Sequence, residues 1–157
     1  MGHTISKNFD FDAAHRLIGH SGKCRNLHGH RYTASVCIAP CKTEDEEDSG
    51  KYDRDELTDD MVIDFGIIGP RIKSWIDTNW DHNVLLHSDD AMIEWYVHLS
   101  ENEDLKLPFY FSTNPTAERM AEVLYHQIKE HLLSPGISVE SIGIWETATS
   151  MAYYSEA

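Results

Sequence analysis

The sequence AHRLIGHSGKCRNLHGH, residues 14–30, joins two strand-like segments and holds three histidines that could share one metal ion. Apolar side chains alternate with polar ones on both sides of it, so a period-2 strand places His15 on the apolar face of the first segment. The same alternation places His28 and His30 on the apolar face of the second. The apolar sets are Ile5, Phe9, Phe11 and Ala13 before the histidines, and Tyr32, Ala34, Val36 and Ile38 after them.

These three histidines have the spacing of metal ligands. His28 and His30 project from one face of a strand, and Gly29 between them leaves room for close approach. Neutral imidazoles suit zinc, and a site with three protein ligands keeps its fourth position open, as catalytic zinc sites do. A lone His-x-His pair also occurs by chance, but His15 and Cys24 in register favour a metal site.

Length and composition indicate one globular domain over residues 1–157, with 41% hydrophobic and 10% aromatic residues. No apolar run approaches the roughly 20 residues of a membrane span, and the N-terminus lacks the layout of a signal peptide. Three cysteines at no disulfide-framework spacing indicate a reducing compartment, so we expect a cytoplasmic protein in which Cys37 and Cys41 have no chemical role.

The net charge of −14 argues against binding to nucleic acid backbones or anionic membranes, since both require excess Lys and Arg. The charge is uneven, because residues 13–43 contain no acid while residues 44–60 hold ten. The basic residues of the first window are Arg16, Lys23, Arg25, Arg31 and Lys42. This window favours a bound phosphate or carboxylate, whereas the acidic loop, 42–60, lacks the ligand order of a calcium loop.

Two helices come after the acidic loop in the predicted order of elements. Residues 61–63 read as a strand, Asp64 can cap the next element, and Gly69-Pro70 predicts a helix start. That helix delivers Trp80, Asp81 and His82 at its end, and an Asp-His pair there can take part in proton transfer. Residues 87–111 read as an insertion with one short helix and a short strand. Asn114-Pro115 predicts the start of the second core helix and Pro135-Gly136 its end.

The C-terminal segment reads as two strands around the turn ETATS, and Glu146 shares the parity of its apolar neighbours. A carboxylate in that place requires a donor partner. The order β-β-α-α-β-β predicts an α+β fold: one four-stranded antiparallel sheet with two helices on one face.

The motifs FDAAHRL, CRNLHGH, IDFG, WDHNVLL, NPTAERMA and WETATSMAYY, in this order, resemble the 6-pyruvoyltetrahydropterin synthase family, whose fold is the tunnelling fold. The resemblance is closest to the 6-carboxytetrahydropterin synthase branch, since Cys24 stands three residues before the HGH motif. It implies a homo-oligomeric barrel, a hexamer built from two trimers with sites between subunits. The implied reaction converts 7,8-dihydroneopterin triphosphate to 6-carboxytetrahydropterin, on the route to queuosine and related deazapurines.

The resemblance also assigns roles to residues. His15, His28 and His30 would bind Zn²⁺, Cys24 would be the catalytic thiol, Asp81 and His82 a proton relay, and Glu146 the anchor of the pterin ring. Arg16, Lys23 and Arg25 would hold the triphosphate.

Departures from the family pattern concern the substrate pocket rather than the metal site. They are Trp80 before the Asp-His pair, Leu86 where the family has Asn, and Arg119 in place of a common Asn. Two other functions stay open at this point: 6-pyruvoyltetrahydropterin synthase activity, and a non-catalytic zinc-stabilised assembly module.

Overall fold

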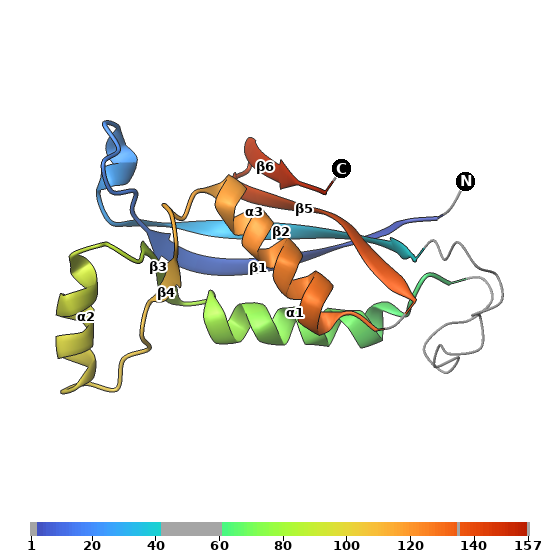
Figure 1. Ribbon diagram of the computed structural model, residues 1–157, viewed down its shortest axis with the longest axis horizontal. Helices are drawn as coiled ribbons and strands as arrows, with labels where there is room; N and C mark the ends of the chain where they lie inside the picture. Colours follow the sequence, from blue (N-terminus) through green and yellow to red (C-terminus); the bar gives the residue numbers. More distant parts are fainter. Residues whose placement is uncertain (1–2, 42–60, 135, 157) are drawn as a thin grey trace.

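The computed structural model describes residues 3–41, 61–134 and 136–156, and shows one sheet with helices α1 and α3 on one face (Figure 1). The acidic loop at 42–60 and the predicted helix end at Pro135 lie outside the described residues. The elements are β1 Ile5–His15, a 3₁₀ turn Lys23–Arg25, β2 His28–Pro40, α1 Phe65–Asn79, β3 Asn83–His87, α2 Met92–Ser100, β4 Phe109–Phe111, α3 Ala117–Gln127 with a π-helical turn Ile128–Leu132, β5 Ile137–Thr147 and β6 Ser150–Tyr154.

The α+β class is confirmed, but the expected four-stranded antiparallel sheet is wrong in strand number and partly in direction. The sheet has six strands in the order β4-β3-β1-β2-β5-β6. The four predicted strands are antiparallel neighbours, whereas β3 pairs with β1 and β4 pairs with β3 in parallel. The strand β3 adds to the sheet because Leu85 and Leu86 are fully buried there.

The core lies between the sheet and helices α1 and α3, and the predicted strand alternation decides which side chains enter it. Phe9, Phe11, Ala13 and His15 are buried on β1, and Tyr32 to Ile38 supply every second residue of β2. Trp80 is fully buried and its ring lies 5.7 Å from Phe11 and 6.1 Å from Phe111. Trp80 therefore belongs to the core rather than to a pocket.

Helix α1 begins earlier than the sequence predicts. Asp64 accepts a hydrogen bond from the Gly66 N–H and caps the helix, as expected, so the helix starts at Phe65 and Pro70 lies inside it. Pro70 is the sixth residue of the helix, beyond its first turn, so the helix lacks one i→i−4 hydrogen bond there. The expected strand at 61–63 is absent from the described chain, and Val62 and Ile63 instead bury their side chains in the core.

Helix α3 also has a different cap from the predicted one. The Thr116 side chain accepts from the Arg119 N–H, whereas Asn114 bonds through its side chain to both backbone groups of Ile18. The helix therefore starts at Ala117, two residues after Pro115.

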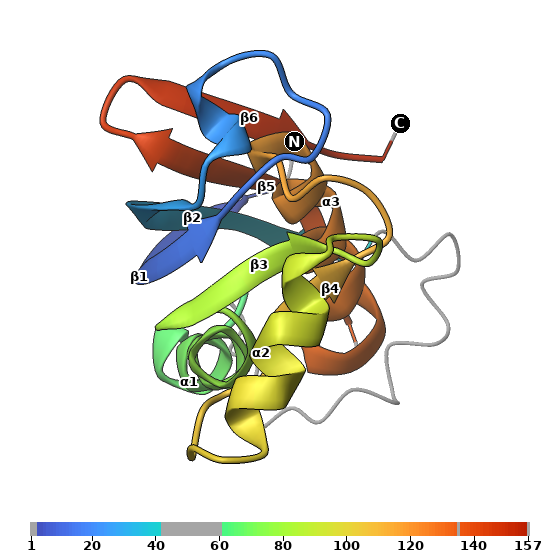
Figure 2. The same ribbon diagram turned by 90° about the vertical axis from the view of Figure 1, so that its left-hand side faces the viewer.

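The 87–111 insertion adds a third helix that the predicted order of elements left out. Helix α2 lies at the end of the molecule beyond β3 and β4, and none of its residues is buried (Figure 2). Among the described residues, no helix has the length and apolarity needed to span a bilayer.

Candidate metal centre and active-site cleft

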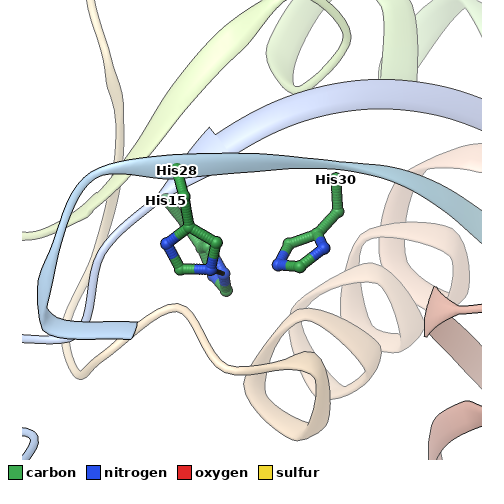
Figure 3. Close-up of side chains that lie close together, drawn as sticks. All are labelled: His15, His28 and His30. Atoms are coloured by element: carbon green, nitrogen blue, oxygen red, sulfur yellow. Dashed lines mark hydrogen bonds between the residues drawn. The ribbon is translucent and has the colours of Figure 1, made fainter. Parts of the chain in front are cut away.

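The pairing of β1 with β2 brings the three histidines together. His15 ends β1 and lies directly opposite His28, which begins β2, while His30 lies opposite Ala13. Since residues two apart share a face, all three rings point to the helix-covered side of the sheet (Figure 3). The predicted group of three imidazoles thus forms within one chain.

The spacing of the ring nitrogens fits a metal ion. The Nε2 atoms of His15 and His28 lie 3.2 Å apart, and one ligand atom from each histidine lies within 4.8 Å of the others. Two nitrogens bound tetrahedrally to one zinc ion at about 2.0–2.1 Å lie roughly 3.3–3.4 Å apart. A small closing movement of His30 would therefore complete a three-ligand site.

Backbone carbonyls hold two of the rings in the orientation that metal binding needs. The Nδ1–H of His15 donates to the Pro115 carbonyl at 2.9 Å, and that of His28 to the Asn26 carbonyl at 2.8 Å. Both Nε2 atoms are then left with lone pairs, as in zinc sites whose histidines are oriented by outer partners. His30 Nε2 is buried and has no hydrogen-bond partner within the described residues, so it too is available as a ligand.

Burial favours the neutral form of two of these imidazoles, His15 and His30. Burial lowers the pKa of His15 and of His30 below the ordinary value of 6.5, although the nearby Glu146 carboxylate acts in the opposite direction. Neutral imidazoles are the form that binds a metal. The three residues could therefore hold a metal ion at neutral pH.

A cleft of about 360 Å³ lies beside the histidines and contains both the thiol and the carboxylate that the sequence singled out. Cys24, on the 3₁₀ turn, and Glu146, at the end of β5, both line it. Glu146 Oε1 lies 3.7 Å from His30 Nε2, which is too long for a hydrogen bond but links the cleft to the histidine cluster. The thiol and the carboxylate thus line one cleft, and Glu146 connects that cleft to His30 of the histidine cluster.

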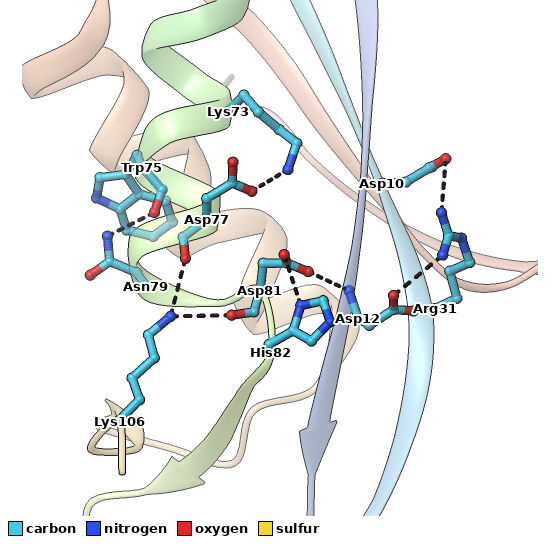
Figure 4. Close-up of polar contacts among 10 residues, drawn as sticks. All are labelled: Asp10, Asp12, Arg31, Lys73, Trp75, Asp77, Asn79, Asp81, His82 and Lys106. Atoms are coloured by element: carbon cyan, nitrogen blue, oxygen red, sulfur yellow. Dashed lines mark hydrogen bonds and ion pairs between the residues drawn. The ribbon is translucent and has the colours of Figure 1, made fainter. Parts of the chain in front are cut away.

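Asp81 and His82 form the predicted pair (Figure 4), and His82 lines a different hollow from that of Cys24. His82 Nδ1 lies 2.9 Å from Asp81 Oδ2, and the Asp12 N–H donates to Asp81 Oδ1 at 2.9 Å. Burial would raise the pKa of Asp81, but the hydrogen bonds from Asp12 and His82 outweigh it and lower the pKa below 3.8. The exposed His82 shares its hollow with Asp12, Gly29 and the candidate metal ligand His30, and not with Cys24.

The basic residues differ in how free they are to bind a phosphate. Arg16 Nε lies 2.8 Å from Asp90 Oδ2, so this guanidinium already has a buried carboxylate partner. Lys23 and Arg25 are exposed on the 3₁₀ turn and flank Cys24. The structure therefore places two of the three predicted cations beside the cleft without an acidic partner among the salt bridges of the described chain.

Sequence reasoning missed several residues of the site. His20, Thr116 and Glu118 also line the cleft, and Glu118 adds a second carboxylate opposite the thiol-bearing turn. Glu118 stands in the NPTAERMA motif, in the first turn of α3. By contrast, the departures at Trp80 and Leu86 lie in the core and do not line the cleft.

Proteins of known name are similar in sequence to this chain over most of its length. The 6-carboxy-5,6,7,8-tetrahydropterin synthase of Rickettsia typhi is 41% identical over 143 residues, which cover 90% of this chain and 92% of that protein. The protein of the same name from Haemophilus influenzae is 33% identical over 155 residues, or 97% of this chain and 98% of that one.

Solved structures share the fold. An uncharacterized protein from Wolinella succinogenes superposes with a TM-score of 0.76 at 21% identity over 100% of this chain and 99% of that one. The Caenorhabditis elegans 6-pyruvoyl tetrahydropterin synthase superposes with a TM-score of 0.63 at 21% identity, covering 100% and 97%. The sequence profile of the 6-pyruvoyl tetrahydropterin synthase family matches residues 4–157, and the chain belongs to that family.

Proposed function

We propose that this protein is a zinc-dependent lyase that converts 7,8-dihydroneopterin triphosphate to 6-carboxytetrahydropterin, with release of acetaldehyde and triphosphate. The observation that carries the proposal is a cleft lined by the Cys24 thiol and the Glu146 carboxylate, with Glu146 lying 3.7 Å from His30 of the three-imidazole cluster. Relatives from two bacterial genera that bear the name of this activity support it. The expected pathway is the synthesis of queuosine and related deazapurines, in a reducing cytoplasm that suits the free Cys24 thiol.

The residues of the cleft suggest how the substrate is held. A pterin presents adjacent N–H donors at one edge of its ring, and Glu146 could accept two of them, which would satisfy a partly buried carboxylate. Glu118 offers a second acceptor in the same cleft, so the ring can be held from two sides. Lys23 and Arg25 would contact the triphosphate at the exposed turn.

The chain also supplies groups for proton transfer. Cys24 Sγ, which lines the cleft, can hold or release a proton beside the substrate side chain. A zinc ion held by His15, His28 and His30 would supply a Lewis acid that stabilises negative charge next to the cleft. His82, oriented by Asp81, would be the second acid and base.

We further propose a homo-oligomer, a hexamer of two trimers, because His82 of the relay pair and the Cys24 thiol line separate hollows in one chain. A neighbouring copy could bring its Asp81–His82 pair to the cleft. The sheet leaves edges for such an assembly: β3 pairs with β1 only from Ala13 to His15, so the preceding edge of β1 has no strand partner in the described chain. The strand β6 ends the sheet on the other side.

A cysteine variant tests the proposal. In Cys24→Ala we expect full zinc content and an unchanged thermal unfolding curve, with turnover of dihydroneopterin triphosphate lowered by about 10²–10⁴-fold, the usual contribution of a positioned acid or base. Cys37→Ala is the matched control, because Cys37 lies on β2 away from the cleft. Full turnover by a folded, zinc-loaded Cys24→Ala protein would remove the central step of the mechanism.

A further inference from the structure

The segment 88–108, which carries α2, has an attachment at each end that the proposed function does not use. Helix α2 itself buries no residue and lies beyond the sheet (Figures 1 and 2). Its first attachment is Asp90, whose side chain is completely buried and whose Oδ2 lies 2.8 Å from Arg16 Nε. Asp90 Oδ1 also accepts the Met92 N–H at 2.9 Å, which fixes the start of α2. The segment 88–108, called the arm below, is thus fixed in place where it leaves the sheet.

The second attachment is Lys106, where the chain returns towards β4. Its Nζ donates to the backbone carbonyls of Asp77 and Asp81, both at 3.1 Å (Figure 4). The Asp77 carbonyl belongs to the last turn of α1, where the C=O groups have no partners within the helix, and Asp81 lies two residues beyond the end of that helix. The last turn of α1 contains no basic residue, so Lys106 brings the cation that a helix C-terminus favours from 25 residues further along the chain.

This contact falls on the backbone of the proposed proton relay. Asp81 carries a negative charge at the negative end of α1, an unfavourable place that a neighbouring ammonium group offsets. His82 has a left-handed backbone with φ of 52°, a conformation that a non-glycine residue keeps only when its surroundings hold it. The His82 N–H donates to the Asp12 carbonyl at 2.7 Å, so Asp12 holds one side of the turn and Lys106 the other.

We propose that Lys106 is a positioning residue for the Asp81–His82 pair, and that the 88–108 arm fixes the geometry of the relay. The inference rests on the proposed function, because it assigns the pair its role in proton transfer. Lys106 does not touch the Asp81 carboxylate or the His82 ring among the contacts of the described chain; it acts through the Asp81 carbonyl. Its loss should therefore disturb the orientation of His82 and leave the metal site and the cleft unchanged.

The test compares Lys106→Met with Lys106→Arg, which keeps the positive charge, and with Glu103→Gln, a charge-removing change in the same exposed loop. In Lys106→Met we expect kcat to fall about two- to fivefold, the effect of a cation at a helix C-terminus, with KM and zinc content unchanged. Lys106→Arg should restore most of kcat, and Glu103→Gln should match the wild type. A role in stability alone would lower the melting temperature without this kinetic pattern.

A second measurement needs no turnover. In ¹⁵N-labelled wild type, the His82 ring should show a proton fixed on Nδ1 by Asp81, and in Lys106→Met the two ring tautomers should average. If the wild type shows no turnover, the proposed function fails, while this spectrum still decides the role of Lys106. An unchanged His82 spectrum together with an unchanged kcat in Lys106→Met would overturn the inference.

Discussion

Loss of His28 should remove most of the stabilisation that zinc gives to this protein. His28 is the cross-strand partner of His15, and their Nε2 atoms lie 3.2 Å apart. His28→Ala leaves two imidazoles and opens a path for water to the ion. The protein should still fold, because the His28 side chain is only half-buried and contributes little to the core.

The size of the effect can be worked out from ligand number and chain length. At a zinc concentration of 1,000 times Kd, binding stabilises the folded state by about 4.1 kcal/mol. An unfolding entropy of about 2.1 cal/mol/K per residue gives roughly 0.33 kcal/mol/K for 157 residues, so zinc should raise the melting temperature by about 12 °C. If four-ligand sites share about 10–16 kcal/mol among their ligands, one imidazole contributes about 2.5–4 kcal/mol. Its loss then weakens Kd by roughly two to three orders of magnitude, and the shift falls to about 1–4 °C.

The assay is thermal unfolding of metal-stripped protein with and without zinc at a fixed concentration. His98→Ala on the exposed helix α2 is the matched control and should keep the full wild-type shift. A His28→Ala protein whose melting temperature rises with zinc as much as that of the wild type would refute the assignment of the three histidines.

Three further predictions concern the cleft, the relay and the core. Glu146→Gln should lower kcat/KM by roughly 10–100-fold, which is the contribution expected of hydrogen bonds to a charged group. Glu118→Gln should have a smaller effect, because the Glu118 side chain is more exposed than that of Glu146. Equal kcat/KM values for Glu146→Gln and wild type would contradict the proposed anchor. Because the pKa of Asp81 is lowered in the folded protein, its carboxylate stabilises the fold above pH 3.8, and this contribution is lost as pH falls through the lower folded-state pKa. The difference in unfolding free energy between wild type and Asp81→Asn should therefore shrink in acid. A difference that stays constant with pH would contradict the hydrogen-bonded carboxylate. Trp80→Ala should cost about 3–5 kcal/mol in urea unfolding, and a loss below about 1 kcal/mol would contradict its place in the core.

Local patterns in the sequence predicted the long strands and the grouping of the histidines well, because both depend on which residues alternate between the two faces of a strand. The alternation in β1 and β2 and the His-x-His spacing were enough to place His15, His28 and His30 on one face. The contribution of β3 and β4 could not be predicted in this way. Both strands are short, and their parallel pairing depends on where α1 returns the chain rather than on any local alternation.

Contacts between residues far apart in the sequence explain most of the differences between the predicted site and the observed one. Arg16 looks free in the sequence, but Asp90 binds it from 74 residues away. Gly69-Pro70 resembles a helix start, although Asp64 had already capped the helix. The sequence paired Asp81 with His82 and placed Cys24 near the histidines, but nothing local indicates that His82 and Cys24 line separate hollows.

The most direct test of the account is to incubate the zinc-loaded protein with 7,8-dihydroneopterin triphosphate and to identify the products by mass spectrometry. The account predicts 6-carboxytetrahydropterin together with acetaldehyde and triphosphate, at one zinc ion per chain. A 6-pyruvoyl product without acetaldehyde would assign the chain to the other reaction of the family, and an absence of any turnover by fully zinc-loaded protein would contradict the account.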